Sequence, residues 1–381
     1  MKNSVEKAFS LILESNLSAL KQDSERRFTL LIVGEPTLTA SLAEALSANR
    51  AKPGIHPWIS LHSLVHPEAI EHLHEIDVVL LVVEHSALTG EEVTFIRGLH
   101  RASVPTIVVI VDASARPADG GEVRSEPPRR FEAGRVVLAE AQDQELIQKR
   151  LVPALVSAAE SNLRLAIARQ FPIARAPIVD QLIEEAARAN AIYAASSGVA
   201  EAIPILNLTL NAADLLILSK NQLLMSYKIA LAAGKQGQTK ELMGEVVGVV
   251  GSGFLFRQVA RQLVGLIPIV GIVPKIAVAY AGTWVVGHTV YLWAAEDKNL
   301  DIEEARILYN SVLARGRTVA LDIMKDIGKR RPKDSKDAPA LPSPYNEQAT
   351  VDGSVAQAAS SPTPIDSTLN EPENAPEEPA S

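Results

Sequence analysis

Three unbroken apolar runs constrain the fold of this chain more than any other feature of its sequence. They read FTLLIVG at Phe28–Gly34, DVVLLVVE at Asp77–Glu84 and VPTIVVIVD at Val104–Asp112. Short apolar runs without polar alternation are typical of parallel strands that are buried on both faces. Helical patterns lie between them. Residues 26–155 are therefore predicted to form a doubly wound parallel α/β sheet.

The first of these strands leads into a sequence that can be aligned with a phosphate-binding loop. Ligands of such sheets bind at the carboxyl ends of the strands. When the pattern G-x-x-x-x-G-K-[ST] starts at Gly34, the second glycine falls on Thr39, the lysine on Ala40 and the hydroxyl residue on Ser41. The lysine that would offset the β- and γ-phosphate charge is absent, so the motif predicts phosphate binding only weakly.

Residues 26–155 resemble a small GTPase domain of the Era/septin-like class. The run VPTIVVIVDAS resembles the strand that leads to the guanine-reading N-K-x-D, whose four positions here are Val111, Asp112, Ala113 and Ser114. The switch motif D-x-x-G is missing before Asp77. With all three motifs altered, the resemblance implies a pseudo-GTPase with no catalytic residue and no cofactor. An atypical site that still binds GTP or another nucleotide is the alternative.

For that resemblance, the residues of interest are the relics of the nucleotide site. The phosphate-loop relic comprises Gly34, Thr39 and Ser41, and the base-reading relic comprises Asp112 and Ser114.

Residues 156–331 carry long helical patterns and the most apolar stretches of the chain. Ile276–Ala295 has 20 residues without a formal charge, which meets the minimum for a bilayer span, and Leu263–Pro274 is a shorter apolar segment. Both are candidate membrane segments, and the alternative is a buried helix of a bundle. Candidate membrane or helix-contact residues are the small-residue stripe Ala279, Thr283 and Gly287, together with Lys275.

The helical half is also similar to the YcjF-like domain, uncharacterised domain family number 697, over roughly Ile178–Trp293. The sequences NQLLM at Asn221–Met225 and KIAVAYAGT at Lys275–Thr283 carry this resemblance. It implies a membrane-associated domain that follows a GTPase domain, at the cytosolic face of a bacterial inner membrane. The implied partners are membrane lipid and a protein, either an active GTPase or a second copy of this chain. A soluble, cytoplasmic helical scaffold is the alternative.

The two ends of the chain differ in composition from the residues between them. Residues 1–25 are predicted to form an amphipathic helix. Residues 332–381 hold nine carboxylates and two lysines among Pro, Ser and Ala, which predicts a disordered acidic tail. Since the net charge of the whole chain is −8, the remaining residues are close to neutral. A near-neutral body argues against nucleic acid as a partner.

Two kinds of metal or redox site are not expected. The chain has no cysteine, which excludes disulfides and thiolate-bound metals. Most of its histidines lie between His56 and His100, but their spacings do not place a pair on one helix face beside a carboxylate. The sequence therefore predicts no metal site.

Overall fold

The computed structural model of the chain divides it into two units, residues 1–331 and 332–381. The structure describes residues 15–48, 55, 57–65, 70–84, 87–112, 134–201, 212–251 and 272–329. All of these belong to the first unit. The predictions for residues 1–14, for Ser114 and for the acidic tail lie outside the described residues.

Five strands form one parallel sheet in the order β2-β1-β3-β4-β5. Their bounds are β1 Thr29–Gly34, β2 Trp58–His62, β3 Val78–Val83, β4 Thr106–Val111 and β5 Gly134–Leu138. The parallel α/β sheet predicted from the apolar runs is therefore confirmed. In β1, β3 and β4 almost every residue is buried, which explains why these runs lack polar alternation.

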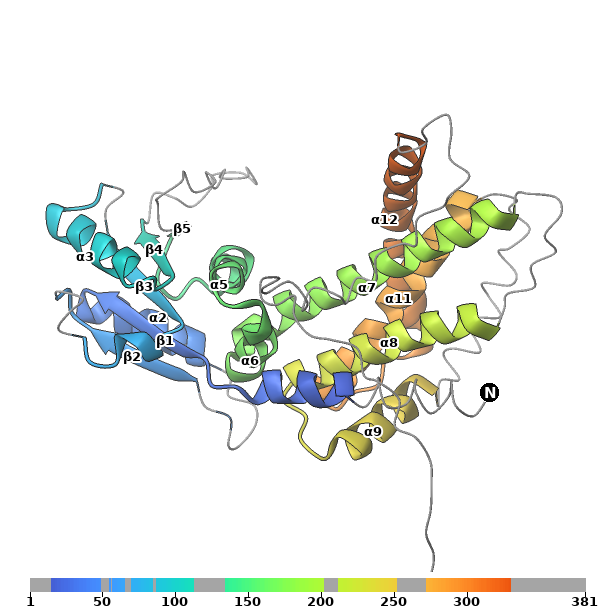
Figure 1. Ribbon diagram of the computed structural model, residues 1–381, viewed down its shortest axis with the longest axis horizontal. Coiled ribbons are helices and arrows are strands. Elements are labelled where there is room, and N and C mark those ends of the chain that lie inside the picture. Colours follow the sequence, from blue (N-terminus) through green and yellow to red (C-terminus); the bar gives the residue numbers. More distant parts are fainter. Residues whose placement is uncertain are drawn as a thin grey trace, which may run out of the picture. The chain divides into compact units, whose positions relative to one another are not determined.

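Helices cover both faces of the sheet (Figure 1). Leu30 and Ile32 of β1 pack with α2 (Pro36–Ser47) and with the segment formed by α4 (Gln144–Leu146), η4 (Ile147–Leu151) and α5 (Val152–Ala158). Leu31 and Val33 point to the other face, where α3 (Gly90–Arg101) packs. Helix α3 begins with a capping box between Thr89 and Glu92, whose side chains each accept a backbone N–H.

The remaining described elements are helical. They are η5 Ser161–Leu163, α6 Arg164–Gln170, α7 Pro172–Glu201, α8 Ala212–Ala232, α9 Thr239–Gly251, α11 Ile272–Glu296 and α12 Ile302–Lys329. Residues 15–25 are also helical, and Leu17 of that helix is buried in the main core. A short helix η2, Leu73–Glu75, precedes β3.

The sheet and the helices share one hydrophobic core. Gln170 at the end of α6 donates to the Arg26 carbonyl at 2.7 Å and accepts from the Phe28 N–H at 3.3 Å. The rings of Phe28 and Phe171 meet edge to face with centroids 5.8 Å apart. These contacts fix the start of β1 against the helical half.

The candidate span Ile276–Ala295 requires correction. It forms most of α11, and among the described residues no helix combines the length and the apolar character needed to cross a bilayer. Its apolar side chains are used inside the protein, since Tyr280, Val286 and Val290 are buried against neighbouring helices. The segment is apolar because it is the central helix of a bundle. Residues 263–271 of the second candidate segment lie outside the described residues.

Candidate functional site

The crevice predicted from Gly34 lies at the carboxyl end of β1, beside β3. Gly34 pairs with Val82 of β3 and has φ +153°. A Cβ atom at Gly34 would lie only 2.4 Å from the Val82 carbonyl oxygen. The glycine is therefore explained by the close approach of two neighbouring strands.

The connection after Gly34 is too short for a phosphate loop. A single residue, Glu35, separates β1 from α2, and Pro36 begins the helix. Thr39 lies inside α2 and is buried, with its hydroxyl donating to the Pro36 carbonyl at 3.1 Å. Ser41 lies half-buried in the next turn of the same helix. The residues aligned with the loop are thus helical, and their backbone N–H groups from Thr39 onward bond within α2.

The N-terminus of α2 already holds an anion, which is the carboxylate of Glu35. Its side chain accepts the Leu38 N–H at 2.9 Å. Hydrogen bonds from the backbone of Thr37 and Leu38 lower the pKa of Glu35, so the carboxylate is favoured there. The position that a phosphate would take at this helix terminus is filled by the protein itself.

Acidic residues directly follow three neighbouring strands. Glu35 comes after β1, Glu84 after β3 and Asp112 after β4, and Asp112 donates its N–H to the Leu138 carbonyl at 2.9 Å. The carboxyl ends of parallel strands lie along one edge of the sheet. This edge therefore carries negative charge, which disfavours a phosphate ligand.

The predicted small-residue stripe lies where α11 packs on α7. Thr283 is buried, accepts a hydrogen bond from the Asn190 amide at 3.0 Å and donates to the Ala279 carbonyl at 2.8 Å. A Cβ atom at Gly287 would lie 2.4 Å from a side-chain carbon of Ile183. Small residues here let two helices approach closely. Lys275 is half-buried in the first turn of α11.

A charged cluster joins α7, α11 and α12 beside this stripe. Glu184 accepts a hydrogen bond from the Tyr280 hydroxyl and pairs with Arg188 at 2.6 Å and Arg315 at 3.0 Å. Burial and the bond to Glu184 raise the pKa of Tyr280 to about 12. Burial opposes ionisation of Glu184, but the donors outweigh it and lower its pKa. The Glu184 carboxylate is matched by the Tyr280 hydroxyl and by two arginines, so we assign the cluster to the packing of these three helices.

Three side chains on the surface have the spacing of metal ligands, which the sequence prediction missed. The His72 Nδ1 lies 3.4 Å from a Glu75 oxygen, and the His74 Nε2 lies 3.9 Å from the same atom. The exposed fractions of these side chains are 69%, 81% and 54% for His72, His74 and Glu75. Side chains this exposed are not oriented by buried neighbours, which metal sites ordinarily use.

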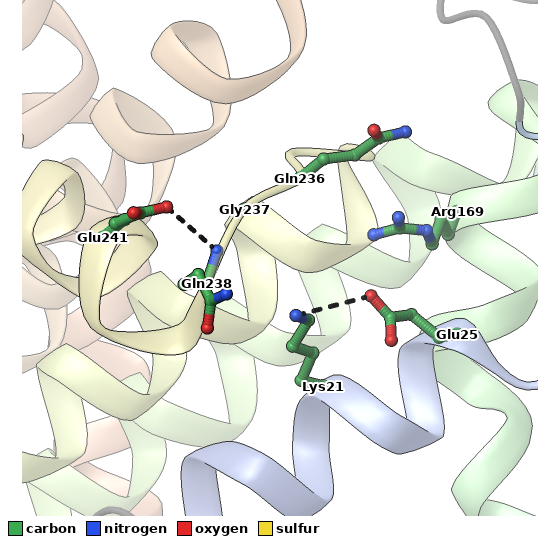
Figure 2. Close-up of a pocket in the computed structure, with 7 residues that line it drawn as sticks. All are labelled: Lys21, Glu25, Arg169, Gln236, Gly237, Gln238 and Glu241. Carbon is green, nitrogen blue, oxygen red and sulfur yellow. Dashed lines mark hydrogen bonds and ion pairs between the residues drawn. The ribbon is translucent and has the colours of Figure 1, made fainter.

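A polar cavity of about 620 Å³ lies between the helix of residues 15–25, α6 and the turn from α8 to α9 (Figure 2). Its lining residues are Lys21, Glu25, Arg169, Gln236, Gly237, Gln238 and Glu241. Arg169 is buried, with 8% of its surface exposed, and donates from Nη1 to the Lys235 carbonyl at 3.1 Å. No sequence motif marks this cavity, because its residues come from three distant segments.

Comparison with known proteins adds no family. No protein family model matches the chain, and no curated protein matches it.

Proposed function

We propose that this chain is a non-catalytic scaffold, in which a GTPase-like sheet supports protein contacts and no longer holds a nucleotide. The observation that carries the proposal is the start of α2. Glu35 caps the helix where a phosphate would bind, and the connection from β1 leaves no loop to surround one. The acidic edge formed by Glu35, Glu84 and Asp112 adds electrostatic repulsion of phosphate.

The rival proposal is an atypical NTPase, and phosphate release from GTP or ATP with Mg²⁺ separates the two. The scaffold proposal expects the full chain to release no phosphate above the buffer background. Turnover that purifies with the chain and changes in a Glu35→Arg variant that folds as stably as the wild type would support the NTPase. Glu44→Arg, on the exposed face of the same helix, is the matched control for the added charge.

The edge strand β2 is the surface that best fits a protein partner. It pairs only with β1 in the described part of the chain, and its sequence WISLH contains no Lys, Arg, Asp or Glu. Trp58 and Leu61 are 48% and 44% exposed, and the Arg27 guanidinium lies 3.7 Å from the centre of the Trp58 ring. Edge strands are usually protected by charge or by cover, so this edge is suited to pairing with another strand.

We propose a second copy of this chain as the partner at that edge. Sedimentation velocity over a range of protein concentrations tests this directly. Wild-type protein is expected to self-associate, and Leu61→Lys is expected to weaken the association by about tenfold or more, because a charge at the edge blocks pairing. Ile302→Lys, at an apolar residue of α12 that is 41% exposed, is the control. A chain that stays monomeric, or that loses association equally in both variants, would reject this partner.

A further inference from the structure

The buried guanidinium of Arg169 has more donors than the protein uses. An arginine side chain has five N–H donors, and one Nη1 hydrogen bond to the Lys235 carbonyl is made with the described residues. Arg175 packs beside it and donates to the carbonyls of Ala168 and Arg169, both at 3.2 Å. Neither arginine forms an ion pair with a carboxylate in the part of the chain that the structure describes. Burial lowers the pKa of both.

The two carboxylates of the cavity have polar partners there, and the charge of Glu25 also acts on Arg169 by raising its pKa. Glu25 pairs with Lys21 at 3.9 Å, and Glu241 accepts the Gln238 N–H at 3.2 Å at the start of α9 (Figure 2). Figure 2 shows the Arg169 guanidinium pointing from α6 into the cavity, on the same side as the Glu25 carboxylate. Arg169 has no direct ion pair among the described residues, and the Glu25 carboxylate offsets only part of the effect of burial on its pKa. An anion held directly against the guanidinium would offset more of the cost of burying this charge.

We propose that this cavity binds the oxyanion of a small ligand, a carboxylate or a phosphate, with Arg169 and Lys21 as its cationic contacts. A guanidinium matches the planar pair of oxygens in such groups. Gln236 and Gln238 supply neutral amides for the rest of the ligand, and the pocket, of about 620 Å³, is open to solvent, so a small ligand can reach Arg169 directly. The site is distant in the chain from Glu35, so it does not depend on the scaffold proposal.

Titration calorimetry of the full chain with sodium phosphate and with sodium succinate, at constant ionic strength in NaCl, tests the site. Saturable binding of at least one anion is expected. Lys21→Gln is expected to weaken it by about three- to tenfold, because a partly exposed cation is lost. Lys149→Gln is the matched control, since Lys149 also pairs with a glutamate four residues away on a helix surface.

Arg169→Lys keeps the charge and removes the planar donor pair, so about tenfold weaker binding is expected. Arg169 also contacts the Lys235 carbonyl, so the Arg169→Lys result counts only if the variant melts at the same temperature as the wild type. If it melts lower, Gln238→Ala, at an exposed residue of the cavity, is used in its place. Absence of saturable heat with both anions would overturn the proposal. So would equal affinities in the wild type, Lys21→Gln and Lys149→Gln.

The source of the oxyanion is tested with vesicles. Phosphatidylglycerol in phosphatidylcholine vesicles is compared with phosphatidylcholine alone by co-sedimentation. Phosphate binding without co-sedimentation supports a free small ligand, and co-sedimentation that excess phosphate reverses supports a lipid headgroup. Co-sedimentation that is insensitive to phosphate and to Lys21→Gln, with no calorimetric binding, would count against the cavity.

Discussion

At Gly34 the backbone of β1 leaves no room for a side chain. The Val82 carbonyl occupies the space that a Cβ would need, and the next residue, Glu35, turns its carboxylate back onto the first turn of α2. The glycine and the acidic cap are thus local requirements of a one-residue strand-to-helix connection. Pro36 at the first helical position is itself a helix-start signal in the sequence.

Replacing Gly34 by alanine is expected to destabilise the protein by about 3 kcal/mol or more, since a rigid backbone atom must move. Urea unfolding measures this. Gly134→Ala, at the start of β5, is the matched control because nothing lies within 4 Å of its added Cβ, and a change within about 0.5 kcal/mol is expected there. Equal effects of the two substitutions would refute the steric role of Gly34.

The Glu35 cap makes a pH-dependent contribution to stability. The pKa of Glu35 is lowered in the folded protein, so its contribution is fully present above its ordinary value of 4.5 and is lost as the pH falls through the folded pKa. Glu35→Gln is expected to flatten stability against pH in that acidic range, relative to the wild type and to Glu44→Gln. Unfolding curves from pH 3 to pH 6 measure this; identical pH profiles for the three proteins would show that the cap carries no charge-dependent stability.

The sequence of helix α11 does not distinguish a membrane-spanning helix from a helix buried in a bundle. An apolar stretch of 20 residues satisfies a bilayer and a bundle core equally well. In this protein the helix contacts polar groups of neighbouring helices. Asn190 of α7 donates to Thr283. Arg315 of α12 pairs with Glu184, the residue that accepts the Tyr280 hydroxyl. Those contacts link residues far apart in the chain, so no local pattern could show them.

Two glycines of α11 differ only in what faces them. Gly287→Ala is expected to destabilise the protein by about 1–3 kcal/mol, because its Cβ would overlap Ile183. Gly282→Ala meets nothing within 4 Å and is expected to be neutral or to stabilise by up to about 1 kcal/mol, since alanine favours helix. Thermal or urea unfolding compares them. A Gly282→Ala variant that is the less stable of the two would contradict the α7–α11 packing.

Two buried tyrosines form a second matched pair on neighbouring helices. Tyr280→Phe removes a donor to the Glu184 carboxylate and is expected to cost about 1–3 kcal/mol. The Tyr309 hydroxyl has no partner among the described residues, so Tyr309→Phe is expected to be neutral or slightly stabilising. Unfolding free energies at pH 7 measure both. If Tyr309→Phe costs as much as Tyr280→Phe, the Glu184 cluster is not what holds these helices.

Over the whole molecule, the sequence predicts the sheet better than it predicts a site. Strands β1, β3 and β4 are recognisable because burial on both faces leaves them uniformly apolar. Thr39 and Ser41, which align with a phosphate loop, lie inside α2, and this helix begins at Pro36, three residues before Thr39. The Arg169 cavity had no sequence signal, since it is assembled from three separate segments.

The most direct test of the scaffold account is equilibrium binding of GTP with Mg²⁺ to the full chain, measured with a fluorescent GTP analogue. Lys21→Gln is measured in parallel, so that binding of the triphosphate at the Arg169 cavity is not mistaken for binding at the sheet. The scaffold proposal predicts either no saturable binding or binding that Lys21→Gln weakens about three- to tenfold, as expected at the Arg169 cavity. Saturable binding whose affinity is unchanged in Lys21→Gln and altered in Glu35→Arg, but not in Glu44→Arg, would contradict it, because the nucleotide would then occupy the start of α2.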